Sequence, residues 1–198
     1  MRAATPTDGG TLPMRLFTIA LLLPCAALAQ TGDAAFDAAD KYLTEQSNAR
    51  ACDAFTRYLK EAPSSAHARE AKVKLAYSCW NAGRGGNHHG ELKKLADEGE
   101  KDFARAWAMW ALAERGERQP QDALPLLKQA AGGEGRAGKE ALRLYLGACF
   151  RDIERNSWDF KRVYARVDNI LEMSTSPSEK ARARLLRGQA LLNEGKVP

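Results

Sequence analysis

From Ala34 onward, apolar residues recur at steps of three and four positions, and no stretch shows the alternation of a strand. This is the period of a helix that buries one face. Short segments rich in Gly, Pro, Ser and Asn interrupt the pattern, as such residues do where helices end. The breaks leave nine predicted helices, at residues 34–47, 49–62, 66–82, 90–98, 101–116, 120–131, 137–153, 157–173 and 177–194. Because the connections are short, we expect an all-α protein whose consecutive helices form antiparallel pairs.

The composition supports helices and argues against nucleic-acid binding. Alanine is abundant while Val and Ile are scarce, which favours helices and lets them pack closely. The net charge is +5, from 30 basic and 25 acidic residues that are scattered along the chain. A nucleic-acid partner would require clustered basic residues, so we expect none. A chain of 198 residues is long enough for one domain with its own core.

Small, aromatic and proline residues between positions 39 and 63 have intervals that suit two crossing helices. Ala39 and Ala51 would let the helix backbones approach, and Tyr42 and Phe55 would fill the space toward the next pair. Pro63 would end the second helix, since proline cannot continue it. This pattern resembles that of the tetratricopeptide repeat (TPR) family, in which a helix pair recurs about every 34 residues.

Later segments carry parts of the same pattern. Ala111 and Ala123 have the same separation as the first alanine pair, and Trp107 lies one helical turn before Ala111. Gly147 and Gly188 occupy small-residue positions of later first helices. The resemblance implies that residues 30–198 form helix-pair repeats stacked in a right-handed superhelix. The alternative is an alanine-rich helical bundle without a repeat.

The N-terminus has the three parts of a secretory signal peptide. A short basic start precedes an apolar run at residues 16–23, and an A-x-A cleavage signal ends at Ala29–Gln30. The run is too short to span a membrane. We therefore predict a signal peptide at residues 1–29, with translation starting at Met14, and a periplasmic or secreted protein without a transmembrane span after cleavage.

The cysteines bear on this prediction. Pro24 occupies the position where a bacterial lipobox has a small residue, which argues against a lipid anchor at Cys25. Cys52, Cys79 and Cys149 would remain in an oxidising compartment. A disulfide between Cys52 and Cys79 is one possibility, because their helices should be neighbours, and three small buried side chains are the other.

The sequence contains no motif that indicates catalysis, and we expect no enzyme activity, cofactor or metal. His88 and His89 are adjacent in a glycine-rich loop, where neighbouring side chains point apart and chelate one ion poorly. The same loop lacks the Lys-Ser/Thr ending of a phosphate-binding loop.

We therefore predict a non-enzymatic scaffold or adaptor of the bacterial cell envelope. Its partner would be a protein that places a peptide or helix in a concave groove lined by the first helix of each pair. Helical phase and exposure suggest partner-binding residues at Lys41, Lys72, Tyr77, Arg105, Arg143 and Trp158. One alternative is an N-terminal helical module of a larger envelope protein, such as a macroglobulin-like one. Another is a periplasmic protein that binds a small ligand or metal through His88 and His89.

Overall fold

The computed structural model describes the backbone of residues 23–196 and the side chains of residues 34–196. This part of the chain consists of nine α-helices without a strand, so the predicted all-α fold and all nine predicted helices are confirmed. Their bounds are α1 Leu23–Thr44, α2 Asn48–Glu61, α3 Ala68–Asn81, α4 His88–Asp97, α5 Phe103–Glu114, α6 Pro120–Ala131, α7 Gly135–Arg155, α8 Phe160–Met173 and α9 Pro177–Asn193.

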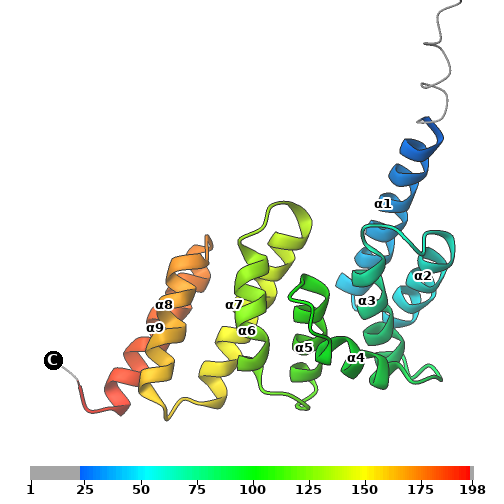
Figure 1. Cartoon of the computed structure of the whole chain (residues 1–198). Coiled ribbons are helices and arrows are strands. Elements are labelled where there is room, and N and C mark those ends of the chain that lie inside the picture. Colours follow the sequence, from blue (N-terminus) through cyan, green and yellow to red (C-terminus); the bar gives the residue numbers. More distant parts are fainter. Residues whose placement is uncertain (1–22, 197–198) are drawn as a thin grey trace, which may run out of the picture.

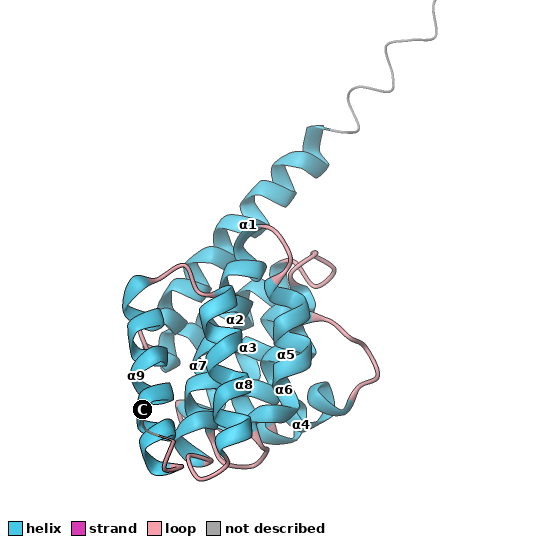
Figure 2. Ribbon diagram, turned by 90° about the vertical axis from the view of Figure 1, so that its left-hand side faces the viewer, coloured by secondary structure: helices cyan, strands magenta, loops and turns pink. Residues whose placement is uncertain are grey.

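The largest difference from the prediction is the start of α1, which lies at Leu23 rather than at residue 34. Pro24 is the second residue of the helix, where the missing N–H of proline breaks no hydrogen bond. The alanine-rich segment that follows offers no other break. As a result, α1 continues through the predicted cleavage site at Ala29–Gln30 and projects beyond the other helices (Figures 1 and 2). Residues 1–22, with Met14 and most of the predicted signal peptide, lie outside the described residues.

The helices are arranged in the order of the sequence. Each helix contacts the one before and the one after it, and α1 and α9 lie near opposite ends of the array (Figure 1). In addition, α1 contacts α3, α3 contacts α5, and α5 contacts α7. The odd-numbered helices from α1 to α7 therefore lie next to one another, which is consistent with a helical repeat.

Side chains fix several of the helix starts. Asn87, Asp102, Asp159 and Ser176 each accept a hydrogen bond from a backbone N–H three residues later. Such caps satisfy N–H groups that have no partner within the helix. Because these polar residues stand just after the loops, they explain why the breaks in the sequence marked the helix ends so well.

The repeat-like residues of the first pair lie where α1 and α2 meet. Ala39, Ala51 and Phe55 are fully buried in a small core shared by α1, α2 and α3. Tyr42 is half-buried and packs against this core. Pro63 is exposed just beyond the end of α2, which stops at Glu61.

The later residues of the repeat-like pattern differ in how deeply they are buried. Trp107, Ala111 and Ala123 are buried in the larger core, which extends from α3 to α9. Gly147 is half-buried beside Arg151, and Gly188 faces open space. The alanines of the pattern, with Phe55 and Trp107, are therefore buried, whereas Gly188 on α9 is left uncovered.

A disulfide joins Cys52 on α2 to Cys79 on α3, which is one of the two alternatives left open by the sequence. It links the first helix pair to the second and is consistent with an oxidising compartment. Cys149 is a buried free thiol, and burial raises its pKa to about 11. Within residues 23–196, no helix is both long enough and apolar enough to cross a membrane.

Candidate binding groove

Three adjoining hollows form a groove along the odd-numbered helices. The first, of about 560 Å³, lies among α1, α3, α5 and α7, and the others measure about 420 and 460 Å³. Arg143 of α7 lines all three, and Trp110 of α5 lines two of them. We call this surface the groove and define it by six of its lining residues: Asp40, Tyr77, Asn81, Trp110, Glu140 and Arg143.

An aromatic cluster forms one wall of the groove. The ring centroids of Tyr77 and Trp107 lie 5.0 Å apart and those of Trp107 and Trp110 lie 5.1 Å apart, in edge-to-face arrangements. Trp107 is buried, so the half-buried rings of Tyr77 and Trp110 are the ones that a ligand can touch. The periodicity of the sequence places Trp107 and Trp110 on the same face, and the structure divides that face between core and groove.

The two indole N–H groups have different surroundings. Nε1 of Trp107 donates a hydrogen bond to Oε1 of Glu140 at 2.9 Å. Nε1 of Trp110 is buried without a hydrogen-bond partner among the described residues. Buried donors of this kind are uncommon, because the lost hydration is not replaced. Trp110 therefore carries a buried donor that no described residue pairs with.

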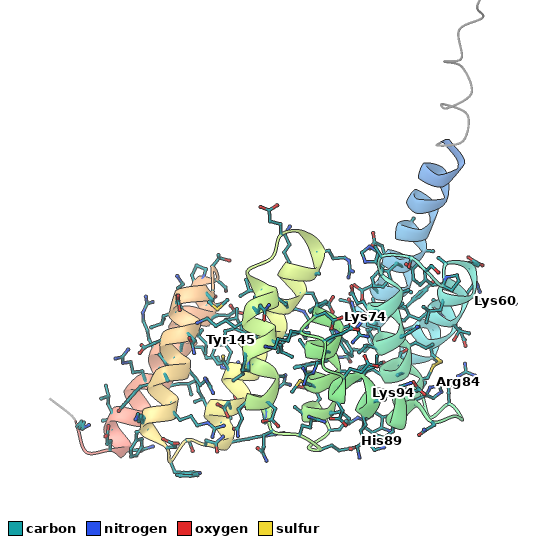
Figure 3. The ribbon with its side chains drawn as sticks, in the orientation of Figure 1. Lys60, Lys74, Arg84, His89, Lys94 and Tyr145 are labelled. Atoms are coloured by element: carbon teal, nitrogen blue, oxygen red, sulfur yellow. A yellow bond between two sulfur atoms is a disulfide. The ribbon has the colours of Figure 1, made fainter. Side chains whose placement is uncertain are left out.

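Beside this wall lies a buried ionic cluster centred on Lys74 of α3. Lys74 is 0% exposed, and its Nζ lies 2.5 Å from Oδ1 of Asp40, 2.7 Å from Oε2 of Glu140 and 2.9 Å from Oε1 of Glu70. Figure 3 shows Lys74 within the array, whereas Lys60 lies at its outer edge. One ammonium group thus joins carboxylates from α1, α3 and α7.

Arg136 adds a second cation to the same three carboxylates. Its guanidinium donates to both carboxylate oxygens of Glu70, at 3.0 and 2.9 Å, and to Oδ2 of Asp40 at 3.2 Å. It also lies 3.4 Å from Oε2 of Glu140. Both contacts to Glu70 come from Nη2, while Nη1 donates to Asp40, so a single guanidinium bridges α3 and α1. The cluster therefore positions α7 relative to α1, although these two helices are far apart in the sequence.

The pKa directions within the cluster follow from the competition between burial and pairing. Burial favours neutral Lys74, but Glu140, Glu70 and Asp40 outweigh it and raise the pKa of the ammonium group. Burial likewise favours neutral Glu70, but Lys74 and Arg136 lower the pKa of its carboxyl group. Both groups are charged at neutral pH, so the cluster is a set of fixed ion pairs.

Arg143 differs from the cations of the cluster. It is exposed, and none of the described side chains forms an ion pair or a hydrogen bond with it. Its neighbours along the groove are engaged: Arg151 pairs with Glu114, and Arg115 donates to the amide oxygen of Asn81. Arg143 is therefore a cation that a ligand can reach without breaking an existing ion pair.

Of the six predicted partner-binding residues, the structure brings Tyr77 and Arg143 together in the groove. Lys72 lines a separate hollow of about 700 Å³ between α3 and α4. Lys72 and Tyr77 are five positions apart, which corresponds to roughly 140° around a helix, so they lie on different sides of α3. The prediction from helical phase was too coarse to separate these two sides.

The other three candidates lie elsewhere. Nε of Arg105 donates to the backbone carbonyl of Ala96 at 3.0 Å, which holds the α4–α5 connection. Lys41 is exposed on α1, with its Nζ 3.9 Å from Oε1 of Glu45. Trp158 is 74% exposed in the connection between α7 and α8. These three residues therefore lie in separate environments and do not form a common surface.

The hollow between α3 and α4 is larger than any single hollow of the groove, but its chemistry is less suited to a partner. Its Arg69 is already paired with Glu98 and Asp102, and none of the residues that line it is aromatic apart from His88. The groove extends over four helices and combines aromatic rings with an available cation. We therefore regard the groove as the stronger candidate site.

The two adjacent histidines contact different groups. Nε2 of His88 lies 3.0 Å from the carbonyl oxygen of Gly85. Nε2 of His89 lies 2.5 Å from Oε2 of Glu117, and its ring stacks on Trp80 with centroids 4.9 Å apart. In the described part of the chain, no group of three or more His, Cys, Asp or Glu side chains is placed to hold a metal ion.

The ionic cluster was missed by the sequence analysis. Glu70 and Lys74, and likewise Arg136 and Glu140, are spaced four apart, which is the spacing of ordinary exposed ion pairs on a helix. The available signal was that Lys74 lies among the buried positions of an otherwise apolar helical face. Its significance depends on Asp40 and Glu140, which only the tertiary structure brings near.

Comparison of the chain with models of protein families, with curated proteins and with solved structures finds no match. The function must therefore be argued from the fold and the groove themselves.

Proposed function

We propose that this protein is a non-enzymatic interaction scaffold that holds a peptide segment or helix of a partner protein in the groove. In this proposal the helix pairs stack in a right-handed, TPR-like superhelix whose concave side is lined by the odd-numbered helices. The observation that carries the proposal is the run of adjoining hollows around Tyr77, Trp110 and Arg143.

The chemistry of the groove suits recognition of a peptide. Large aromatic residues and arginine dominate the binding energy of many protein interfaces. The faces of Tyr77 and Trp110 offer apolar contact, while Arg143 offers hydrogen bonds and charge to a carbonyl or carboxylate. The neighbouring carboxylates of Asp40 and Glu140 are already held by Lys74 and Arg136, so their role is to position helices rather than to transfer protons.

The proposed setting is the bacterial cell envelope. Two independent features support it: the signal-like sequence at residues 1–29 and the disulfide between Cys52 and Cys79. Fractionation of native cells tests this proposal. A periplasmic band shorter than the full chain supports it, and a full-length band in the cytoplasm with both cysteines reduced contradicts it.

Selection of peptides from a random display library tests the groove. Peptides selected on the wild-type chain should lose at least about tenfold in affinity on Tyr77→Ala or Arg143→Glu, because truncating a hot-spot anchor costs about 2 kcal/mol or more and each 1.4 kcal/mol is about tenfold. Lys60→Glu is the matched control, since Lys60 is exposed on α2 outside the groove. Selected peptides that bind the two groove variants as tightly as the wild type would remove the proposal.

A further inference from the structure

The last helix, α9, has an uncovered apolar stripe on its outer side. The stripe consists of Ala181, Leu185, Gly188 and Leu192, which are spaced as residues on one helical face. Leu185 is 63% exposed and Leu192 is 59% exposed, and they are two of the three large hydrophobic side chains described as exposed. No other atom lies within 4 Å of the position that a Cβ on Gly188 would take.

The opposite side of α9 accounts for its packing within the protein. Ala183 and Ala190 are buried there against the rest of the core. By contrast, α7 contacts three helices, α5, α6 and α8. Helix α9 therefore presents a second apolar face of the kind that neighbouring helices cover elsewhere in the array.

The shape of the stripe fits a helix. Gly188 forms a notch between the two exposed leucines, and a small residue at this position lets another helix backbone approach closely. The repeat-like sequence pattern places Ala39 and Ala111 at the corresponding positions of α1 and α5, and both are fully buried. Side chains of an incoming helix can pack into such a notch, as ridges pack into grooves.

The charges beside the stripe are basic. Arg184 and Lys180 have no ion-pair partner among the described residues. The two acidic residues of this segment are engaged: Glu179 accepts a hydrogen bond from the hydroxyl of Ser174, and Glu194 accepts one from the hydroxyl of Tyr164. The unpaired basic residues at the rim of the stripe therefore attract acidic groups. The acidic residues of this segment are already engaged and are not available to a basic partner.

We propose that the outer stripe of α9 docks an amphipathic helix of a partner protein that carries acidic residues at the edges of its apolar face. A second copy of this chain fits the charges less well, because it would bring the same basic rim without an acidic complement. This surface is distinct from the groove, and the proposal does not depend on what the groove binds.

Two synthetic helical peptides of about 18 residues test the proposal. Both carry leucines with the helical spacing of the stripe, and one has glutamates beside them where the other has lysines. Fluorescence anisotropy should show that the acidic peptide binds the wild-type chain at least about tenfold more tightly than the basic one. Leu192→Glu should abolish this binding, whereas Trp158→Ser, which alters an exposed hydrophobic residue outside α9, should leave it unchanged.

Several results would overturn the proposal. Equal binding of the two peptides would remove the role of the basic rim, and absence of binding would remove the docking surface. Binding that survives Leu192→Glu but is lost in Arg143→Glu would assign the peptide to the groove. A wild-type dimer in sedimentation equilibrium that Leu192→Glu converts to monomer would identify a second copy as the occupant. Circular dichroism of each variant confirms that the helices are intact.

Discussion

Asp152 of α7 is a buried carboxylate held by two arginines of α8. Its Oδ2 accepts hydrogen bonds from Nε of Arg162 at 2.9 Å and from Nε of Arg166 at 2.7 Å. Asp152→Asn leaves both guanidinium groups without their counter-charge, so we expect the free energy of unfolding to fall by about 3 kcal/mol in urea titrations. Asp168→Asn is the control, because Asp168 forms an exposed pair with Arg187 and should cost under about 1 kcal/mol. Equal losses in both variants would contradict this account.

The ion pairs also predict how stability depends on pH. Burial favours the neutral forms of Asp152 and Glu70, but their cationic partners lower both pKa values below the ordinary 3.8 and 4.5. A lowered pKa contributes stability that is fully present above the unfolded-state value and is lost as the pH falls through the folded-state value. We therefore expect the free energy of unfolding to decrease as the pH is lowered below about 4. This fall should be shallower in Asp152→Asn, and an unchanged slope would show that Asp152 is not responsible.

At the scale of single residues, the sequence predicted which side chains are buried better than it predicted which polar side chains pair with one another. The alanines and Phe55 lie in the core as their period indicates, since a helical period reports which side faces inward. Lys74 lies on the same inward side, yet its partners come from α1 and α7, far away in the sequence. No local spacing contains that information.

Two helical glycines provide a test at the scale of elements. A Cβ on Gly138 would overlap the carbonyl oxygen of Gly133, so Gly138 lets α7 begin close to the end of α6. Gly138→Ala should lower the free energy of unfolding by about 1–3 kcal/mol. Gly188→Ala meets open space and should raise it by about 0.5–1 kcal/mol through helix propensity. Thermal unfolding followed by circular dichroism measures both, and effects of the same sign would contradict the packing described at the α6–α7 turn.

The disulfide provides a second test at this scale. It joins α2 to α3 across a sequence separation of 27 residues. Closing a loop of this length should stabilise the folded chain by about 3–4 kcal/mol, because it restricts the unfolded ensemble. The double variant Cys52→Ser, Cys79→Ser should therefore unfold at lower urea concentration and should not respond to reductant, whereas Cys149→Ser keeps the bridge and should lose stability on reduction. An unchanged unfolding midpoint would mean that the bridge is absent or adds nothing.

Helix ends were largely predictable because turn and cap residues mark them locally. The start of α1 is the exception, because an export signal followed by a folded domain predicts a helix start at residue 34, whereas one continuous helix begins at Leu23. It was harder still to predict which side of α3 faces which surface. Lys72 is charged and Tyr77 is aromatic, so both were candidates for a binding surface, and only the positions of α4 and α5 determine which surface each one lines.

At the scale of the whole molecule, the order of helices creates the groove. Contacts of α1 with α3, α3 with α5 and α5 with α7 bring side chains from four helices to one surface. The ionic cluster of Lys74 and Arg136 joins α1, α3 and α7 beside it. The sequence predicted that such a surface would exist. Which residues line it around Trp110 and Arg143 could be seen only in the tertiary structure.

The central claim is that this surface binds a partner peptide, and the tryptophan indole signals in a ¹⁵N NMR spectrum test it directly. A peptide selected on the wild-type chain is titrated into the labelled protein. We predict that the Trp110 indole N–H signal shifts, because the half-buried Trp110 side chain lines the groove, while the signal of the exposed Trp158 stays in place. A bound peptide that shifts the Trp158 signal and leaves that of Trp110 unchanged would contradict the assignment of the groove.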